Sequence, residues 1–404
     1  MSSAEEVAAW AAGLDVLPHD VDEWIRLAFL DFLGLFAAGE AAIARGVGGL
    51  RLHHPVERAD RGTSELELAG LAYHYARAAN VLDGDDGNNL AGAAHVGSTV
   101  FGSLLAAATP STSYASFRVA AAIGYEVGIR SGATYGAGPY VSSGAAATIA
   151  GAAGLATLRG LPLIPALSVA TARAPLSALS DEGMRESIGW AAFTAFLVGG
   201  GSGPSSLFGY SPLDDTAPGF TLQGSYRKPY LACRATHSAL DAVRELRDRH
   251  AIDPAAITSI VVETTTFGSL LTNAAPITID AAVFSYPTVI ALALLYDGPR
   301  PADWLEERYR APQVRSLAAL VTLVQSDWAD SQSPASYPAR VTIFAGSTYT
   351  AEVLVPRGDA SLPLEAHDVV AKAAEGTAYG TASPHVLTAE GTLGELLPHL
   401  LKGK

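Results

Sequence analysis

Hydrophobic side chains recur at helical spacing in the first half of the chain, most clearly just after residue 20. The apolar positions there share one face, which predicts a long helix packed against the protein core. These positions are Trp24, Ile25, Ala28, Phe29, Phe32 and Leu33. Asp20 and Glu23 have the spacing of a capping box, so Asp20 is predicted to cap the start of this helix.

Residues from about 95 to 200 are rich in alanine, glycine and serine. Small side chains at helical spacing leave room for helix backbones to approach closely, so this region predicts a dense bundle of nearly uncharged helices. The glycine-rich run Gly199–Pro204 predicts a break or flexible turn.

The pattern changes between residues 222 and 358. Ile257–Thr266 is rich in β-branched residues and predicts a strand. Arg340–Phe344 and Thr348–Val355 alternate apolar and polar residues, and the short connection through Gly346 predicts a hairpin. Helical runs in the same region are Ala239–His250 and Val289–Tyr296. These elements together predict a small α+β domain.

The chain returns to a helical pattern after residue 363, at Glu365–Ala374 and again around Leu393–Leu401. The predicted fold is therefore mainly α. A large all-helical domain would be built from residues 1–221 and 359–404, and a smaller α+β lid domain from residues 222–358.

Composition narrows the classes of partner. The chain has 404 residues, of which 49% are apolar, and its formal charge is −14. That charge opposes binding to nucleic acid or to anionic membranes, although a local cationic cluster could still bind a small anion.

The uncharged stretch Ser131–Leu158 is long enough to span a bilayer, but Pro139 interrupts it, and burial in protein is the preferred interpretation. The acidic N-terminus lacks the features of a secretory signal, so a cytoplasmic location is expected.

The single cysteine, Cys233, excludes an intrachain disulfide, a zinc site with several cysteines and an iron–sulfur cluster. Signatures of a phosphate-binding loop, a dinucleotide-binding turn, a serine-hydrolase elbow and a zinc-protease helix are also lacking. Phosphoryl transfer, dinucleotide redox chemistry and serine hydrolysis therefore lose support.

An acidic segment carries the first candidate chemistry. Asp83, Asp85 and Asp86 lie within four positions and are followed by His95. Crowded carboxylates raise the pKa of one of them, so the group suits general acid–base catalysis. Three alternatives are a calcium loop, a magnesium–diphosphate motif and a solvated loop that caps a helix. Ala94 stands where a calcium loop would end in glutamate, and no second acidic metal motif is found.

A cationic segment is the second candidate for a functional site. Lys228, Arg234 and His237 lie within ten residues and lead into a helix. Such a reversal of charge in an acidic protein suits the binding of a carboxylate, with arginine to grip it and histidine to transfer a proton. The alternative is a basic surface loop with a core histidine.

Taken together, these segments resemble the MmgE/PrpD family, which includes 2-methylcitrate dehydratase, cis-aconitate decarboxylase and iminodisuccinate epimerase. The resemblance runs in order over almost the whole chain. Its segments are Leu82–Asp86 with His95, Gly124–Val127 with Arg130, Gly189–Ala192, Lys228–His237 with Asp241 and Ala242, and Ser285–Pro287 before a helix that ends at Tyr296–Gly298.

The resemblance implies a homodimer and cofactor-free, metal-free chemistry on small carboxylates in a cleft between the two domains. Asp83, His95 and His237 correspond to the family's catalytic positions, and Lys228 to the lysine that opens its second motif. Gly87 stands where the family commonly has threonine. The glycine-rich segment at residues 136–144 offers Tyr140, Ser142 and Ser143 where the decarboxylases place a histidine. Met184 or Arg185 occupies the region where many members have a lysine.

The expected activity is that of a lyase or isomerase, of dehydratase or decarboxylase type, that removes a proton α to a carboxylate or carbonyl. The base would be Asp83, His95 or His237. Substrate-binding candidates are Lys228, Arg234, Tyr140, Arg185 and Tyr286. The altered positions point to a non-standard substrate. Alternatives are an epimerase or cyclase-like enzyme of specialised metabolism on the same scaffold, a magnesium–diphosphate-dependent helical enzyme, and a non-catalytic binding protein.

Overall fold

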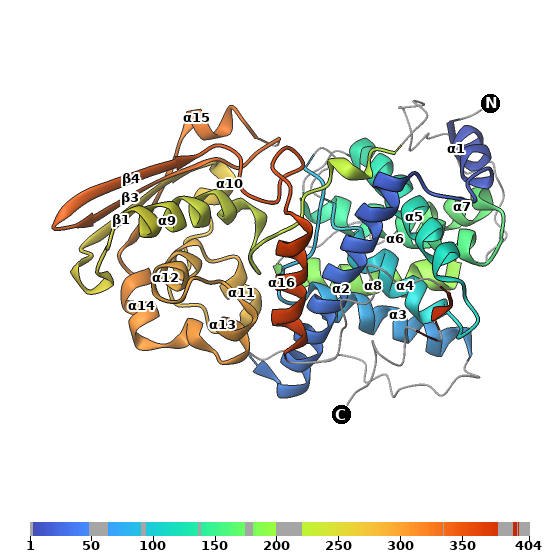
Figure 1. Cartoon of the computed structure of the whole chain (residues 1–404), viewed down its shortest axis with the longest axis horizontal. Coiled ribbons are helices and arrows are strands. Elements are labelled where there is room, and N and C mark those ends of the chain that lie inside the picture. The colour runs from blue at the N-terminus through green and yellow to red at the C-terminus, as the bar shows by residue number, and fades with distance from the viewer. Residues whose placement is uncertain are drawn as a thin grey trace.

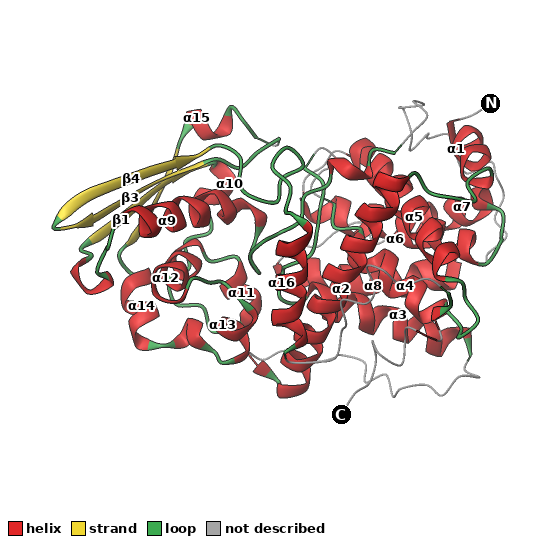
Figure 2. Cartoon of the chain, viewed as in Figure 1, coloured by secondary structure: helices red, strands yellow, loops and turns green. Residues whose placement is uncertain are grey.

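The computed structural model describes residues 3–47, 64–89, 94–135, 139–173, 181–198, 220–333, 335–378, 391–393 and 395. Within these residues the chain is mostly helical, with one small mixed sheet in its C-terminal part, which confirms the predicted mainly α class (Figure 2). Two lobes lie side by side in Figure 1. The helical lobe contains α1–α8 and α16, and the α+β lobe contains the elements from α9 to β4.

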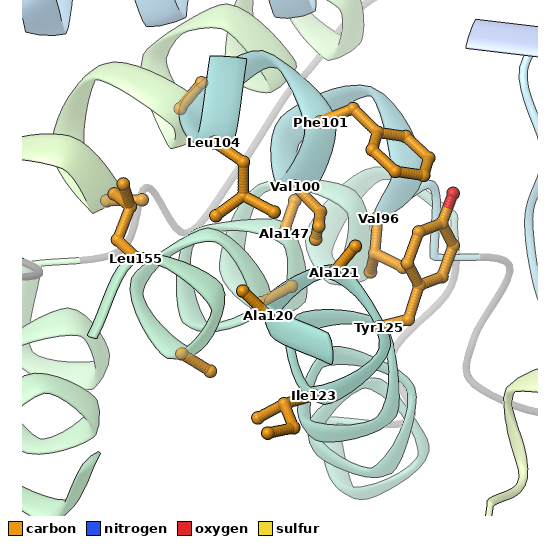
Figure 3. Packing of buried hydrophobic residues seen from close by; sticks show 14 of the residues in the cluster. Val96, Val100, Phe101, Leu104, Ala120, Ala121, Ile123, Tyr125, Ala147 and Leu155 are labelled. Atoms are coloured by element: carbon orange, nitrogen blue, oxygen red, sulfur yellow. The ribbon is translucent and has the colours of Figure 1, made fainter. Parts of the chain in front are cut away.

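Helices from the first half of the chain make up most of the helical lobe. They are α1 (Ser3–Ala12), α2 (His19–Arg45), α3 (Glu65–Asn80), α4 (Gly97–Ala107), α5 (Tyr114–Tyr135), α6 (Pro139–Leu158), α7 (Leu163–Arg173) and α8 (Asp181–Val198). The small residues allow the predicted close packing: an added Cβ at Gly124 in α5 would lie 2.9 Å from the carbonyl oxygen of Ala150 in α6. Figure 3 shows side chains of α4, α5 and α6, with Tyr125 among them, meeting in this core.

The long helix α2 is the predicted N-terminal helix, and all six residues of its predicted apolar face are buried. The predicted capping box is wrong. The helix begins at His19 with Pro18 at its N-cap, and Asp20 instead accepts a hydrogen bond from Gln223. α2 is apolar and long enough to cross a membrane, but 78% of its apolar window is buried inside the protein, as in a core helix. The uncharged stretch Ser131–Leu158 is divided between α5 and α6.

Helix α16 (Ala366–Thr377) returns the C-terminal part of the chain to α2. The crossing is close, because an added Cβ at Gly34 would lie 2.6 Å from the Cα of Ala373. Leu27 and Leu30 of α2 pack there against Val369. The predicted helix at residues 365–374 is thereby confirmed.

The sheet of the α+β lobe has the strand order β2-β1-β3-β4. Its strands are β1 (Ser259–Thr264), β2 (Val321–Gln325), β3 (Ala339–Ala345) and β4 (Ser347–Val353). β1 pairs with β2 in parallel and with β3 in antiparallel fashion. The predicted hairpin is confirmed as β3 and β4, with Gly346 at φ 69° in the turn.

Helix α9 (His237–Arg249) contacts β3 and β4, and α12 (Tyr286–Tyr296) packs on α9 (Figure 1). Both helices were predicted. The shorter helices are α10 (Thr266–Ser269), α11 (Ile279–Val283), α13 (Pro301–Leu305), α14 (Pro312–Ala318) and α15 (Asp327–Asp330). The 3-10 turns are η3 (Leu222–Gly224), η4 (Arg234–Thr236), η5 (Pro254–Ala256) and η6 (Arg308–Arg310).

The core of the α+β lobe extends into the helical lobe. Leu35 and Ala38 of α2, together with Val81 and Leu82, belong to the same buried cluster as Leu231. α2 therefore supports both lobes, and residue 82 brings the acidic segment to the place where they meet. The predicted domain boundaries stay a prediction, and the glycine-rich run at residues 199–204 lies outside the described residues.

Candidate active site

The acidic turn, residues 83–86, directly follows α3. Asp83 donates its backbone N–H to the carbonyl of Asn80 over 2.8 Å, and its φ of 54° is left-handed. Aspartate accepts this conformation more readily than most residues. Gly84 is needed next, because an added Cβ would lie 3.0 Å from Cγ of Leu231. The turn thus places three carboxylates in buried positions.

Each carboxylate of the turn has a different partner. Asp83 accepts hydrogen bonds from Lys228 at its carbonyl, 3.0 Å, and at Oδ1, 2.8 Å. Its second oxygen, Oδ2, is buried without a partner among the described residues. Asp85 accepts from Asn80 over 3.0 Å and from Ser98 over 2.9 Å. The acidic turn is therefore buried and is not the solvated loop that was one of the alternatives.

Asp86 lies in a different environment, because its Oδ2 accepts a 2.7 Å hydrogen bond from the hydroxyl of Tyr125. Burial, reinforced by the charge of Asp85, raises the pKa of Asp86 to about 7, against the opposing effect of the Tyr125 hydrogen bond. Tyr125 belongs to the Gly124–Val127 segment, and its neighbour Glu126 accepts hydrogen bonds from the backbone of Thr221 and Leu222. This segment therefore supports both the acidic turn and the start of the cationic segment.

His95 lies beside the acidic turn, and one of its two ring nitrogens makes a hydrogen bond to that turn. Its Nδ1–H donates to the carbonyl of Asp86 over 2.7 Å, and Nδ1 is 3.6 Å from Oδ1 of Asp85. Because a carbonyl only accepts, the proton is on Nδ1, and Nε2 has a free lone pair. Nε2 makes no hydrogen bond to any residue that the structure describes. Burial lowers the pKa of His95, so the neutral base is the prevailing form near neutral pH.

The cationic segment places Lys228, Arg234 and His237 in one buried group. The Lys228 side chain joins it to Asp83 of the acidic turn. Arg234 donates to Nδ1 of His237 over 3.4 Å and to the carbonyl of Arg357 over 3.1 Å, while its Nε has no partner among the described residues.

Both ring nitrogens of His237 are engaged, because Nε2–H donates to the carbonyl of Ala232 over 3.1 Å. Burial, with the charges of Arg234 and Lys228, lowers the pKa of His237 well below its usual range. In this arrangement His237 is a neutral acceptor that orients Arg234, while the unengaged imidazole nitrogen belongs to His95.

The remaining predicted residues lie apart from this group or outside the described side chains. Tyr286 is fully buried in the α+β lobe, where its hydroxyl bonds Thr264 over 2.8 Å and donates to the carbonyl of Ala235. Tyr286 therefore holds the backbone at Ala235, the residue after Arg234. Tyr140 and Arg185 fall in α6 and α8, and their side chains lie outside the described residues.

Two residues that the sequence did not suggest complete the site. Lys372 of α16 donates to the carbonyl of Gly84 over 2.7 Å and is paired with Asp31 of α2 at 2.8 Å. Tyr226 is 2% exposed, its ring lies 6.4 Å from that of His95, and Arg234 stacks over it at 4.6 Å. Helical periodicity indicates only that position 372 lies on a helix, and a lone tyrosine two residues before a lysine gives no recognisable signal.

The arrangement combines an unprotonated imidazole nitrogen, a lysine–aspartate pair and an arginine with an unused donor. Such a group can bind an organic anion and move a proton at a neighbouring carbon. In the part of the chain that the structure describes, no three His, Cys, Asp or Glu side chains are grouped to hold a metal ion.

The raised pKa of Asp86 leads to a prediction about stability. Between pH 4 and 7 the native protein keeps a proton on Asp86 that the unfolded chain has lost, so native stability falls as the pH rises. Asp86→Asn removes this dependence. The unfolding free energy of the variant relative to the wild type should therefore increase by up to about 1.4 kcal/mol per pH unit in that range and level off above it.

Urea unfolding of both proteins between pH 4.5 and 8 measures this difference. Asp330→Asn is the control, because hydrogen bonds from Thr266 and Gln325 lower the pKa of that exposed carboxylate. A difference between Asp86→Asn and wild type that stays constant over the whole range would contradict the prediction.

One part of the chain matches the model of a known protein family. Residues 230–386 match the family model described as MmgE/PrpD C-terminal domain. The match includes Arg234, His237, Tyr286 and Lys372, and it begins after Lys228. No curated protein matches the chain.

Proposed function

We propose that this chain, whose residues 230–386 match the MmgE/PrpD C-terminal domain, is a lyase or isomerase that removes a proton α to a carboxylate or carbonyl of a small organic acid. The family is generally one of dehydratases. The observation that carries the proposal is the state of His95, whose Nδ1–H is fixed by Asp86 while Nε2 stays unprotonated and without a partner among the described residues.

In the proposed reaction Nε2 of His95 takes the α proton. The electron pair of the broken C–H bond moves toward the carboxylate or carbonyl oxygen. The proton on Nε2 then passes to a β-hydroxyl, which leaves as water, or returns to carbon, and this completes the turnover. Lys228 has three N–H donors and uses two of them on Asp83. Among the described residues the third has no partner, so it is left for the substrate. Arg234 offers its unused Nε–H. The two cations thus hold the acid beside the base.

His237 has a positioning role in this scheme. It accepts a hydrogen bond from Arg234 and is itself held by the carbonyl of Ala232. Asp83 orients Lys228 through two hydrogen bonds. These roles assign the base to His95 among the three candidates.

Proton exchange in heavy water tests the proposal before the substrate is known. The protein is incubated with a panel of small hydroxy and unsaturated acids, and deuterium incorporation at carbon is followed by NMR. We expect exchange into at least one acid, because carbanion formation is visible even when no group leaves. Water loss, CO2 loss or simple epimerisation is then read from the products. Binding of acids with neither exchange nor turnover would contradict the proposal and favour a non-catalytic binding protein.

The homodimer and the cytoplasmic location stay predictions. Sedimentation analysis of the full chain would test the first.

A further inference from the structure

Tyr226 carries a buried hydroxyl with no hydrogen-bond partner among the described residues. Its position is fixed by its backbone, which donates to the carbonyl of Gly87 over 2.8 Å and accepts from the N–H of Gly87 over 3.2 Å. Burying a hydroxyl without a hydrogen-bond partner costs folding free energy, so this group destabilises the fold at its position.

The hydroxyl lies next to the proposed base because residue 87 is a glycine. An added Cβ at Gly87 would overlap the Tyr226 hydroxyl and would lie 3.3 Å from Cε1 of His95. Cε1 is the ring carbon between the two imidazole nitrogens. The missing side chain at position 87 therefore leaves the space that the Tyr226 hydroxyl occupies on the side of the His95 ring.

A second unpaired donor lies beside this hydroxyl. The guanidinium of Arg234 lies 4.6 Å from the centre of the Tyr226 ring, and its Nε is also buried without a partner among the described residues. Two unpaired donors on neighbouring side chains next to a base fit one ligand chemistry, an oxygen anion on the atom adjacent to the one that loses a proton.

We propose that Tyr226 is a further catalytic residue, whose hydroxyl donates a hydrogen bond to the substrate oxygen that gains negative charge when His95 removes the neighbouring proton. The inference rests on the proposed function and specifies its electrophilic group. The C–H bond breaks and its proton goes to Nε2 of His95. The electron pair of that bond forms the C=C bond of an enolate, and the π pair of the C=O bond moves to the oxygen, which accepts the hydrogen bond from Tyr226. The phenol keeps its own proton throughout.

The environment of Tyr226 suits a donor rather than a second base. Burial raises the pKa of its phenol well above the usual range, against the opposing charge of Arg234. A neutral phenol that cannot ionise can still donate a hydrogen bond to a developing charge.

Tyr226→Phe separates catalysis from folding, because it removes the oxygen and keeps the ring under Arg234. We expect deuterium exchange into the active acid to slow by about 10²-fold, in the range found when one such donor is removed. The midpoint of urea unfolding should stay equal or rise, since an unpaired buried hydroxyl has been removed. Gly87→Ala should also slow exchange, because its methyl group displaces the hydroxyl while Tyr226 is retained.

The matched control is Tyr309→Phe, which changes another buried tyrosine, packed against Trp304 in the α+β lobe. It should exchange at the wild-type rate. Unchanged exchange in a folded Tyr226→Phe protein would overturn the assignment of Tyr226 and leave the proposed function intact. If the wild type exchanges none of the acids, the proposed function fails, and the inference fails with it.

Discussion

Replacing His95 with asparagine is expected to slow proton exchange into the substrate by about 10²–10⁴-fold, the usual contribution of a positioned base. Asparagine can keep the hydrogen bond to the carbonyl of Asp86 that Nδ1 now makes, but it offers no basic nitrogen in place of Nε2. The acidic turn should therefore remain in place while proton transfer is lost. Exchange rates measured by NMR, with binding of the same acid measured by calorimetry, would show a large fall in rate with little change in affinity.

His237→Gln is the companion variant. Glutamine can still donate to the carbonyl of Ala232, but Arg234 loses the ring nitrogen that orients it. We expect weaker binding of the acid and a smaller effect on the rate at saturation than for His95. Near-native turnover in both variants would remove the basis for the catalytic assignment.

Replacing Lys372 with methionine is expected to destabilise the protein by about 3–5 kcal/mol, the usual cost of leaving one partner of a buried ion pair. Lys372 and Asp31 are each about 5% exposed and lie 2.8 Å apart, so the remaining carboxylate would be buried without its closest cation. Urea unfolding at pH 7 measures the loss. A change below about 1 kcal/mol would show that the pair contributes little.

The double variant Asp31→Leu/Lys372→Met distinguishes the two tasks of Lys372. Replacing both charges with apolar groups should recover most of the stability. The carbonyl of Gly84 still lacks its donor, so proton exchange should stay below the wild-type rate. Full recovery of both stability and exchange would show that Lys372 has no role in holding the acidic turn.

Periodicity predicted the elements whose burial is regular. α2, α9, α12 and the β3–β4 hairpin were all identified. β3 alternates buried and half-buried positions, whereas α12 is buried along most of its length and is recognisable as a continuous apolar run. β2 was missed: it lies at the edge of the sheet and none of its side chains is fully buried, so Val321–Gln325 lacks the apolar face of an inner strand. The cap predicted at Asp20 was wrong for another reason. The spacing of Asp20 and Glu23 does not determine where the helix begins, and the helix begins one residue earlier, at His19.

The residues of the candidate site were predictable only where several charged side chains lie close together in the sequence. Three aspartates in one turn and three basic side chains in one segment stand out by their charge, and the structure joins them through Lys228 and Asp83. Tyr226 and Lys372 did not stand out. The position of the Tyr226 hydroxyl depends on a backbone pairing with Gly87, and Lys372 acts on a carbonyl 288 residues earlier in the chain. Contacts of this kind are set by tertiary packing and leave no local pattern.

The contact between Lys372 and Gly84 also bears on when the candidate site can be completed during synthesis of the chain. A nascent chain that has emerged as far as the sheet already contains the acidic turn, its histidine and the cationic segment, but not the ammonium group that holds the turn from behind. Domains generally fold as units while the ribosome is still elongating the chain. The helices of the first half can therefore pack early, whereas the complete candidate site has to wait for translation of the helix at residues 366–377.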